Sequence, residues 1–219
     1  KHHLRNIEEA LQADSVTHIL CEKPLVNSFE EFQRVRPKLE QSDKKILINF
    51  MRRYDPSFIE LASLIKSQKF GKILTFQGAF SKGLLHNGSH MLAMLRHLFG
   101  AIDVLDCIFA EPMEDDLYGE FLVRCDKAQG TFSSVKDIKY SVFELSIWFE
   151  NAKIQIKDGG SEISIYAKKP SPLYDGYFIL ELEQTLSDSL SRYASNSLSF
   201  LLEQDGATCK EILNEHLNI

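Results

Sequence analysis

Apolar positions in the first quarter of the chain alternate between helical spacing and short continuous runs. Residues 4–11 repeat apolar side chains at helical spacing, and the apolar run 16–21 that follows predicts a buried strand. Ser28 and Glu31 have the spacing of a capping box, which predicts that a helix begins after Ser28. A further apolar run, 45–50, predicts a second strand. Helix, strand, helix and strand in this order, with short connections, are typical of a parallel sheet covered by helices.

The pattern changes after residue 55. Helices are predicted over 56–69 and 89–99, and a glycine follows the end of each. Runs rich in β-branched and aromatic residues predict strands over 73–80, 102–109, 118–125, 130–135, 143–149, 153–156 and 163–166. Turn residues at 151–152 and 158–160 indicate that the later strands pair as an antiparallel meander.

The predicted fold class is therefore α/β plus α+β. A partial parallel sheet is expected over residues 1–55, followed over 56–184 by a domain with an open, mainly antiparallel sheet. Residues 185–219 are expected to return to helix and to pack back on the first part.

Charge and composition narrow the classes of function. The chain has 25 basic and 31 acidic side chains and a net charge of −6, so we expect no nucleic-acid partner. No apolar run approaches the roughly 20 residues that span a bilayer, and the first residues lack a signal-peptide core. We therefore expect a cytoplasmic protein without membrane contact. The cysteines have no C-x-x-C spacing and are expected to be reduced, mostly buried packing residues: Cys21, Cys107, Cys125 and Cys209.

The first candidate for chemistry is Glu22-Lys23-Pro24, called here the E-K-P loop, which follows the first predicted strand. Ligands of open parallel sheets bind beyond the carboxyl ends of the strands, so Lys23 can project into a crevice there. The alternative is a surface lysine beside a turn proline, and the tripeptide alone favours that alternative.

The second candidate is the histidine segment, residues 83–90, which leads into the predicted helix over 89–99. His90 lies in the first helical turn, where the positive end of the helix dipole favours the neutral imidazole that a general base requires. The alternatives are a structural histidine or, for His86 and His90 at i,i+4, half of a metal site. No third or fourth ligand has a diagnostic spacing, so we expect no metal.

The third candidate is the segment 49–56, in which a strand ends at Arg52, Arg53 and Tyr54 before a helix. Adjacent arginines at a strand end can bind an anionic or polyhydroxylated substrate. They can equally be solvated charges that pair with Asp55 or Glu60.

Taken in this order, the three candidates resemble the glucose-fructose oxidoreductase/inositol dehydrogenase/MocA-like (Gfo/Idh/MocA) family of NAD(P)-dependent sugar dehydrogenases. The resemblance runs from the opening H-L-R-N-I-E-E-A-L to the last helix at 207–217. It implies an N-terminal Rossmann domain followed by a domain whose open sheet forms a homo-dimer or homo-tetramer.

The resemblance also implies the roles of individual residues. Glu22, Lys23 and Pro24 would lie at the nicotinamide of NAD or NADP, with the Lys23–Pro24 bond a candidate for a cis peptide. Lys23 would stabilise an alkoxide, and His90, with His86 beside it in the segment, would serve acid/base catalysis. The substrate, a sugar, nucleotide-sugar or cyclitol, would be bound by Arg52, Arg53 and Asn87.

The chain departs from the family pattern at two places. The aspartate of the family's histidine segment is His86 here, and a second frequent aspartate is Ala93. None of the 11 glycines forms G-x-G-x-x-G, so we expect that the first part of the Rossmann domain precedes Lys1. Two alternatives to a sugar dehydrogenase follow: an NAD-dependent glycosidase of the same family, and a catalytically degenerate paralogue that acts as a sensor or partner subunit.

Overall fold

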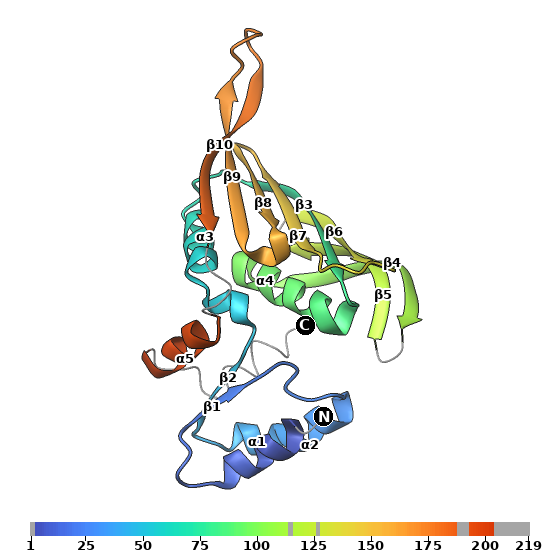
Figure 1. Ribbon diagram of the computed structural model, residues 1–219, viewed down its shortest axis with the longest axis vertical. Helices are drawn as coiled ribbons and strands as arrows, with labels where there is room; N and C mark the ends of the chain where they lie inside the picture. Colours follow the sequence, from blue (N-terminus) through green and yellow to red (C-terminus); the bar gives the residue numbers. More distant parts are fainter. Residues whose placement is uncertain (1–2, 114–115, 126–127, 188–192, 204–219) are drawn as a thin grey trace. The chain divides into compact units, whose positions relative to one another are not determined.

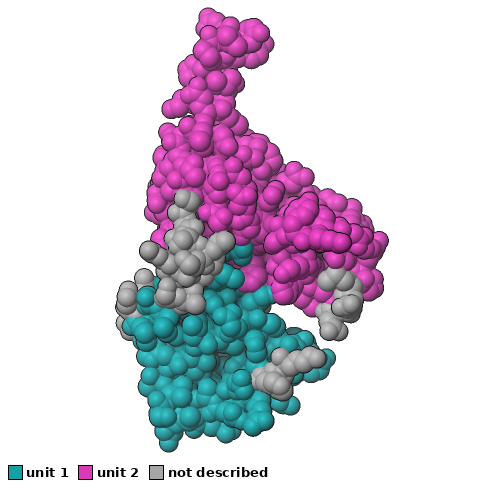
Figure 2. Space-filling view, viewed as in Figure 1, with its two compact units in different colours: residues 1–55, 191–219 teal, residues 56–190 magenta. Residues whose placement is uncertain are grey.

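The structure is a computed structural model that describes residues 3–113, 116–125, 128–187 and 193–203 (Figure 1). The chain divides into two compact units, coloured separately in Figure 2. Unit 1 consists of residues 1–55 and 191–219, and unit 2 of residues 56–190. Among the described helices, none is long and apolar enough to cross a bilayer.

Unit 1 is built on a short parallel sheet. Its first four elements are α1 (His3–Gln12), β1 (His18–Cys21), α2 (Phe29–Glu40) and β2 (Lys45–Ile48). The two strands pair in parallel, with Cys21 opposite Ile48 at their carboxyl ends. The predicted order of helix, strand, helix and strand is therefore confirmed.

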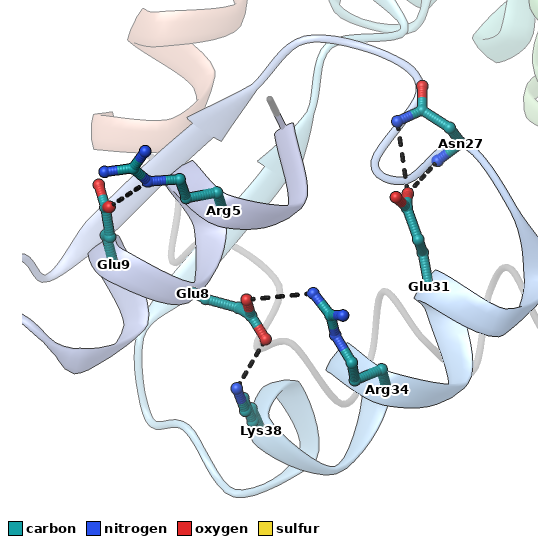
Figure 3. Close-up of polar contacts among 7 residues, drawn as sticks. All are labelled: Arg5, Glu8, Glu9, Asn27, Glu31, Arg34 and Lys38. Carbon is teal, nitrogen blue, oxygen red and sulfur yellow. Dashed lines mark hydrogen bonds and ion pairs between the residues drawn. The ribbon is translucent and has the colours of Figure 1, made fainter. Parts of the chain in front are cut away.

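Helices α1 and α2 share an apolar cluster with the sheet, whose buried members are Leu4, Ile7, Cys21, Val35, Leu39 and Ile46. A polar contact also links the two helices, because the Glu8 carboxylate accepts from Lys38 Nζ at 2.6 Å and lies 3.5 Å from Arg34 Nη2 (Figure 3). Apolar burial supplies most of the packing energy, and the exposed ion pairs add little.

The N-terminus of α2 differs slightly from a capping box. Ser28 Oγ accepts from the Glu31 amide at 3.2 Å, as predicted. The Glu31 carboxylate, however, accepts from the backbone amide of Asn27 at 2.8 Å, one residue before the cap (Figure 3). The reciprocal bond is therefore shifted by one residue but still satisfies a free amide ahead of the helix.

Helix α5 (Tyr193–Glu203) contributes to unit 1 from the far end of the sequence. Its Leu201 is buried with Leu47 of β2 and with Tyr54, which lies in the short 3-10 helix η1 (Met51–Tyr54). The ring centroids of Tyr54 and Phe200 are 4.8 Å apart. Because α1 and α2 form a separate cluster with the sheet, the parallel strands have apolar partners on both faces, as buried parallel strands require.

Unit 2 contains an eight-stranded sheet in the order β10-β9-β8-β7-β3-β6-β5-β4. Its strands are β3 (Ile73–Ser81), β4 (Ile102–Met113), β5 (Asp116–Cys125), β6 (Ala128–Val135), β7 (Phe143–Phe149), β8 (Ala152–Lys157), β9 (Glu162–Pro170) and β10 (Phe178–Ser187). Only β3 and β6 pair in parallel, and all other neighbours are antiparallel. The predicted open, mainly antiparallel sheet is confirmed.

Helices α3 (Pro56–Lys66) and α4 (Ser89–Phe99) cover one face of this sheet (Figure 1). They share a single core with the strands, which includes Phe58, Leu61, Met91 and Leu95. The other face holds an open groove of about 570 Å³, lined by Leu74, Thr75, Phe76, Gln77, Leu122, Gln129, Gly130, Thr131 and Trp148.

Strands β9 and β10 extend beyond the rest of the sheet as a two-stranded ribbon (Figure 1). The end of this ribbon exposes large side chains, among them Leu173 at 80%, Tyr174 at 67% and Tyr177 at 70%. The predicted return to helix near Leu186 is wrong, because Leu186 lies in β10 and pairs with Ile163. Apolar and polar residues alternate only over 180–183, which is too short a pattern to indicate the whole strand. The predicted helix beyond residue 203 lies outside the described residues.

Candidate functional site

In unit 1, the E-K-P loop leaves the sheet at the carboxyl end of β1. The Cys21 carbonyl accepts from the Asn49 amide at 2.7 Å, so the backbone pairing of β1 and β2 continues one residue beyond the strands. Lys23 is partly buried, and the Lys23–Pro24 peptide is cis. His3 Nδ1 donates to the Pro24 carbonyl at 2.6 Å, which fixes the far side of the loop to α1.

Asn49 occupies the position after β2 and is 5% exposed. Its Nδ2 donates to Glu22 Oε1 at 2.6 Å, and its Oδ1 accepts from Ser197 Oγ of α5 at 2.7 Å. Ser197 is fully buried. The loop is therefore tied to the sheet by a side chain as well as by the backbone.

The two arginines lie in η1, directly after β2. Arg52 and Arg53 are both partly exposed, whereas Tyr54 and Asp55 are buried. Both η1 and the E-K-P loop follow the carboxyl ends of adjacent parallel strands, which is the edge at which open parallel sheets bind ligands.

The Cys21 thiol lies directly before the loop and is buried. Burial, with a smaller contribution from the charge of Glu22, raises the pKa of this thiol to about 11. A thiol with such a pKa stays protonated near neutral pH and is a poor nucleophile. Cys21 is therefore a packing residue rather than part of the chemistry.

In unit 2, the histidine segment follows β3. Residues Leu84–Gly88 form a single π-helical turn, η2, which runs directly into α4. His86 is exposed, whereas His90 is buried, with 8% of its surface accessible. The two side chains thus lie in different environments, and no three His, Cys, Asp or Glu side chains gather as a metal site in the described part of the chain.

Asp116, the first residue of β5, holds the start of the histidine segment. Its carboxylate accepts from the Leu85 amide at 2.7 Å and from the His86 amide at 3.0 Å. Gly83 has a φ of +78°, and a Cβ atom there would lie 2.5 Å from this carboxylate. A negative group is thus placed at the N-terminal end of the helix that contains His90, where the macrodipole favours it.

Asn87 is anchored on the other side of the segment. Its Nδ2 lies 3.5 Å from Ser81 Oγ, and that oxygen accepts from the Val142 amide at 2.9 Å. Ser89 Oγ donates back to the carbonyls of Leu85 and His86, both at 2.9 Å. These bonds fix the backbone on which His86 and His90 are mounted.

No protein-family model matches the chain. An inositol 2-dehydrogenase of Corynebacterium glutamicum (strain R) is 39% identical over 61 residues, which are 27% of this chain and 18% of that relative. An oxidoreductase from Thermotoga maritima has the same fold, with a TM-score of 0.70 at 18% identity, over 98% of this chain and 70% of that one. A levoglucosan dehydrogenase in complex with NADH and L-sorbose gives a TM-score of 0.64 at 16% identity, over 87% and 59% of the two chains.

The chain is similar to Gfo/Idh/MocA-type oxidoreductases. The sequence similarity is limited to a local match to inositol dehydrogenases, and the likeness to the solved structure, which extends over nearly the whole chain, shows the fold. The matched segment is less than a fifth of the length of the curated inositol dehydrogenase.

The candidate functional residues that the structure describes form two separate groups, one in each unit. Unit 1 contains Glu22, Lys23, Pro24, Arg52 and Arg53 at the end of the parallel sheet. Unit 2 contains the histidine segment, with His86 exposed and His90 buried.

Sequence reasoning assigned no role to Asn49, Ser197 or Asp116. Asn49 could have been found, because the residues that follow two paired parallel strands meet at the sheet edge, and Glu22 and Asn49 are those residues. Ser197 and Asp116 are separated from their partners by 148 and about 30 residues, and no local pattern indicates such pairs.

Proposed function

We propose that this chain forms part of an NAD(P)-dependent oxidoreductase that transfers hydride between a nicotinamide cofactor and a hydroxyl carbon of a sugar, nucleotide-sugar or cyclitol. The observation that supports this most strongly is the E-K-P loop at the carboxyl end of β1, in a chain similar to inositol 2-dehydrogenases. The levoglucosan dehydrogenase with the same fold contains NADH and a sugar, which supports the same class of cofactor and substrate.

The residues of this chain fit the nicotinamide end of such a cofactor. Lys23 is partly buried beside a parallel sheet edge, and its loop is held by Asn49 and His3. When bound, the nicotinamide would supply the hydride acceptor. Lys23 would then contribute a fixed positive charge that stabilises an alkoxide on the substrate.

We assign proton transfer to His90 and substrate binding to Arg52, Arg53 and Asn87. His90 would take the hydroxyl proton, because an imidazole is the side chain best suited to accept a proton near neutral pH. The guanidinium groups of Arg52 and Arg53 would bind hydroxyl or anionic groups of the substrate. His86, which is exposed, would be available to relay the proton to water.

The test is steady-state kinetics of the whole protein with NAD, NADP and a panel of inositols and hexoses. We expect Lys23→Ala to lower kcat/KM roughly 10²–10³-fold and His90→Asn to lower it by about 10²–10⁴-fold. Lys66→Ala, at an exposed position of α3, and His18→Asn, at an exposed position of β1, are the matched controls and should retain activity. Wild-type protein that neither quenches NADH fluorescence nor oxidises any polyol would contradict the proposal. Release of nitrophenol from a glycoside without added oxidant would identify the glycosidase instead.

We also propose that unit 2 forms a homo-dimer or homo-tetramer through the open face of its sheet. Leu74 is 56% exposed on the groove of that face, and Leu122 and Trp148 line the same groove. A second copy that covers this face would remove these side chains from water. Leu74→Glu should lower the mass measured by light scattering to that of the monomer, whereas Leu202→Glu, at a position 61% exposed on α5, should not.

A further inference from the structure

We propose that Asn49 is a positioning residue that transmits the placement of helix α5 to the E-K-P loop through the hydrogen bonds Ser197–Asn49–Glu22. This inference rests on the proposed function, because it gives Asn49 and α5 a part in holding Lys23 at its site of action. Nothing in the local sequence indicates that α5 contributes to this loop.

Asn49 leaves the parallel sheet beside Glu22. Cys21 and Ile48 are the last paired residues of β1 and β2, so Glu22 and Asn49 leave the sheet side by side. The Asn49 amide donates to the Cys21 carbonyl at 2.7 Å, which fixes the backbone of both strands at this point. The side chain of Asn49 can therefore reach Glu22 without a flexible segment between them.

The directions of its two side-chain hydrogen bonds fix the orientation of the Asn49 amide. A carboxylate only accepts, so the Asn49 Nδ2 group must face Glu22 Oε1, at 2.6 Å. This leaves Asn49 Oδ1 for the Ser197 hydroxyl, at 2.7 Å. Both ends of the amide are thus committed, and a rotation by 180° would place two acceptors against each other.

The hydrogen-bonded relay Ser197–Asn49–Glu22 is buried at Ser197 and Asn49 and exposed at Glu22. Asn49 is 5% exposed and Ser197 is fully buried, while Glu22 is exposed. Buried polar bonds are shielded from water and fix geometry more strongly than surface bonds do. An exposed carboxylate does not need a buried amide to satisfy it, so the bond to Glu22 serves to orient the loop rather than to solvate a charge.

His3 is a second anchor of the E-K-P loop. His3 holds the Pro24 carbonyl at 2.6 Å, and Asn49 holds the Glu22 carboxylate, so the residues on both sides of Lys23 are fixed. The backbone from which the Lys23 side chain extends is therefore restrained at each end. A misplacement of about 1 Å in a catalytic group lowers rates by roughly 10²-fold, so this restraint affects the rate directly.

The test compares Asn49→Asp, Asn49→Ala and Ser197→Ala with the control Ser199→Ala, an exposed serine two residues further along α5. Asn49→Asp keeps the size of the side chain but sets a carboxylate against that of Glu22. We expect it to lower kcat roughly 10–100-fold in the whole protein. Asn49→Ala and Ser197→Ala should lower kcat by smaller factors in that order, and Ser199→Ala should leave it unchanged.

A second readout does not depend on catalysis. Hydrogen exchange of the peptide that contains residues 22–25 should accelerate in Asn49→Asp and in Ser197→Ala but not in Ser199→Ala. Wild-type kcat and unchanged exchange in Asn49→Asp would overturn the inference, as would a lowered unfolding temperature with wild-type kcat. If the wild-type protein proves inactive with every polyol, the proposed function fails, and the exchange measurement alone decides whether the relay orders the loop.

Discussion

Gly83 lies so close to Asp116 that a Cβ atom at Gly83 would come within 2.5 Å of the Asp116 carboxylate. The same carboxylate accepts from the amides of Leu85 and His86. Because Gly83 has no side chain, the Asp116 carboxylate from β5 can reach the start of the histidine segment. The same segment contains His86 at the position where the family pattern has an aspartate. This relationship gives the first two predictions.

Gly83→Ala should destabilise unit 2 by about 2–5 kcal/mol. A left-handed backbone costs a non-glycine residue roughly 1–2 kcal/mol, and overpacking adds about 1–3 kcal/mol. Gly100 is the matched control, since its φ is +83° but a Cβ there meets nothing within 4 Å. Urea unfolding should therefore show a smaller loss for Gly100→Ala, and equal losses for the two variants would contradict the steric part of the argument.

Asp116→Ala should loosen the histidine segment without unfolding the sheet. It removes the acceptor of two exposed amides, to which water can then bind, so each lost hydrogen bond costs about 0.5–1.5 kcal/mol. Exchange of the Leu85 and His86 amides, followed by NMR, should accelerate at least about 10-fold. Asp175→Asn, at an exposed position, should leave both rates unchanged.

Leu201→Ala should destabilise unit 1, because this side chain is 2% exposed and packs with Leu47 and Tyr54. Truncation of a buried leucine costs about 2–5 kcal/mol. The neighbouring Leu202 is 61% exposed, so Leu202→Ala should change the free energy of unfolding by no more than about 0.5 kcal/mol. Equal effects of the two substitutions would show that α5 does not pack on the sheet.

The described cysteines should differ in reactivity. Burial raises the pKa of Cys125 to about 12 and that of Cys21 to about 11, so both thiols stay protonated and inaccessible at mildly alkaline pH. Cys107 is exposed. Mass spectrometry after brief treatment with iodoacetamide should find Cys107 modified and the other two protected until urea is added. Modification of Cys21 in the folded protein would contradict its burial.

Glu8 should make the stability of unit 1 depend on pH in the acid range. The hydrogen bond from Lys38 lowers the pKa of Glu8 below its ordinary value of 4.5. A lowered pKa means that the unfolded chain binds the proton more readily, so the contribution is present above pH 4.5 and is lost as the pH falls through the folded pKa. The difference in unfolding temperature between wild type and Glu8→Gln should therefore shrink on acidification. Glu9→Gln, which removes only a surface pair with Arg5, is the control.

The sequence predicted most of the elements because their patterns are local. The capping residue Ser28, the glycines after α3 and α4, and the apolar strand runs all depend on neighbours a few residues away. Strand β10 was not predicted, because its apolar and polar residues alternate only over 180–183 and the chain was expected to turn to helix near Leu186. The two-stranded ribbon is likewise set by long-range pairing between β9 and β10.

The candidate site was predictable to the same extent. Order and spacing identified the E-K-P loop and the histidine segment, since each is a continuous motif. The groups that hold them could not be found in this way, because Ser197 meets Asn49 from 148 residues away and Asp116 meets the segment from another strand. Local sequence identifies the reactive side chains, whereas tertiary pairing determines how they are held.

The assembly of unit 1 from both ends of the sequence has a consequence for synthesis on the ribosome. Residues 1–55 emerge before unit 2, but the helix that packs on the second cluster of their sheet begins at Tyr193. Unit 2 lies between these parts as one continuous segment and has its own core, so it can fold before α5 leaves the exit tunnel. Until then, Leu47 and Tyr54 lack their partner Leu201, and one face of the parallel sheet is uncovered. Docking of α5 closes a long loop, which makes it a slow step of folding, so residues 1–55 are completed only after unit 2 has been synthesised.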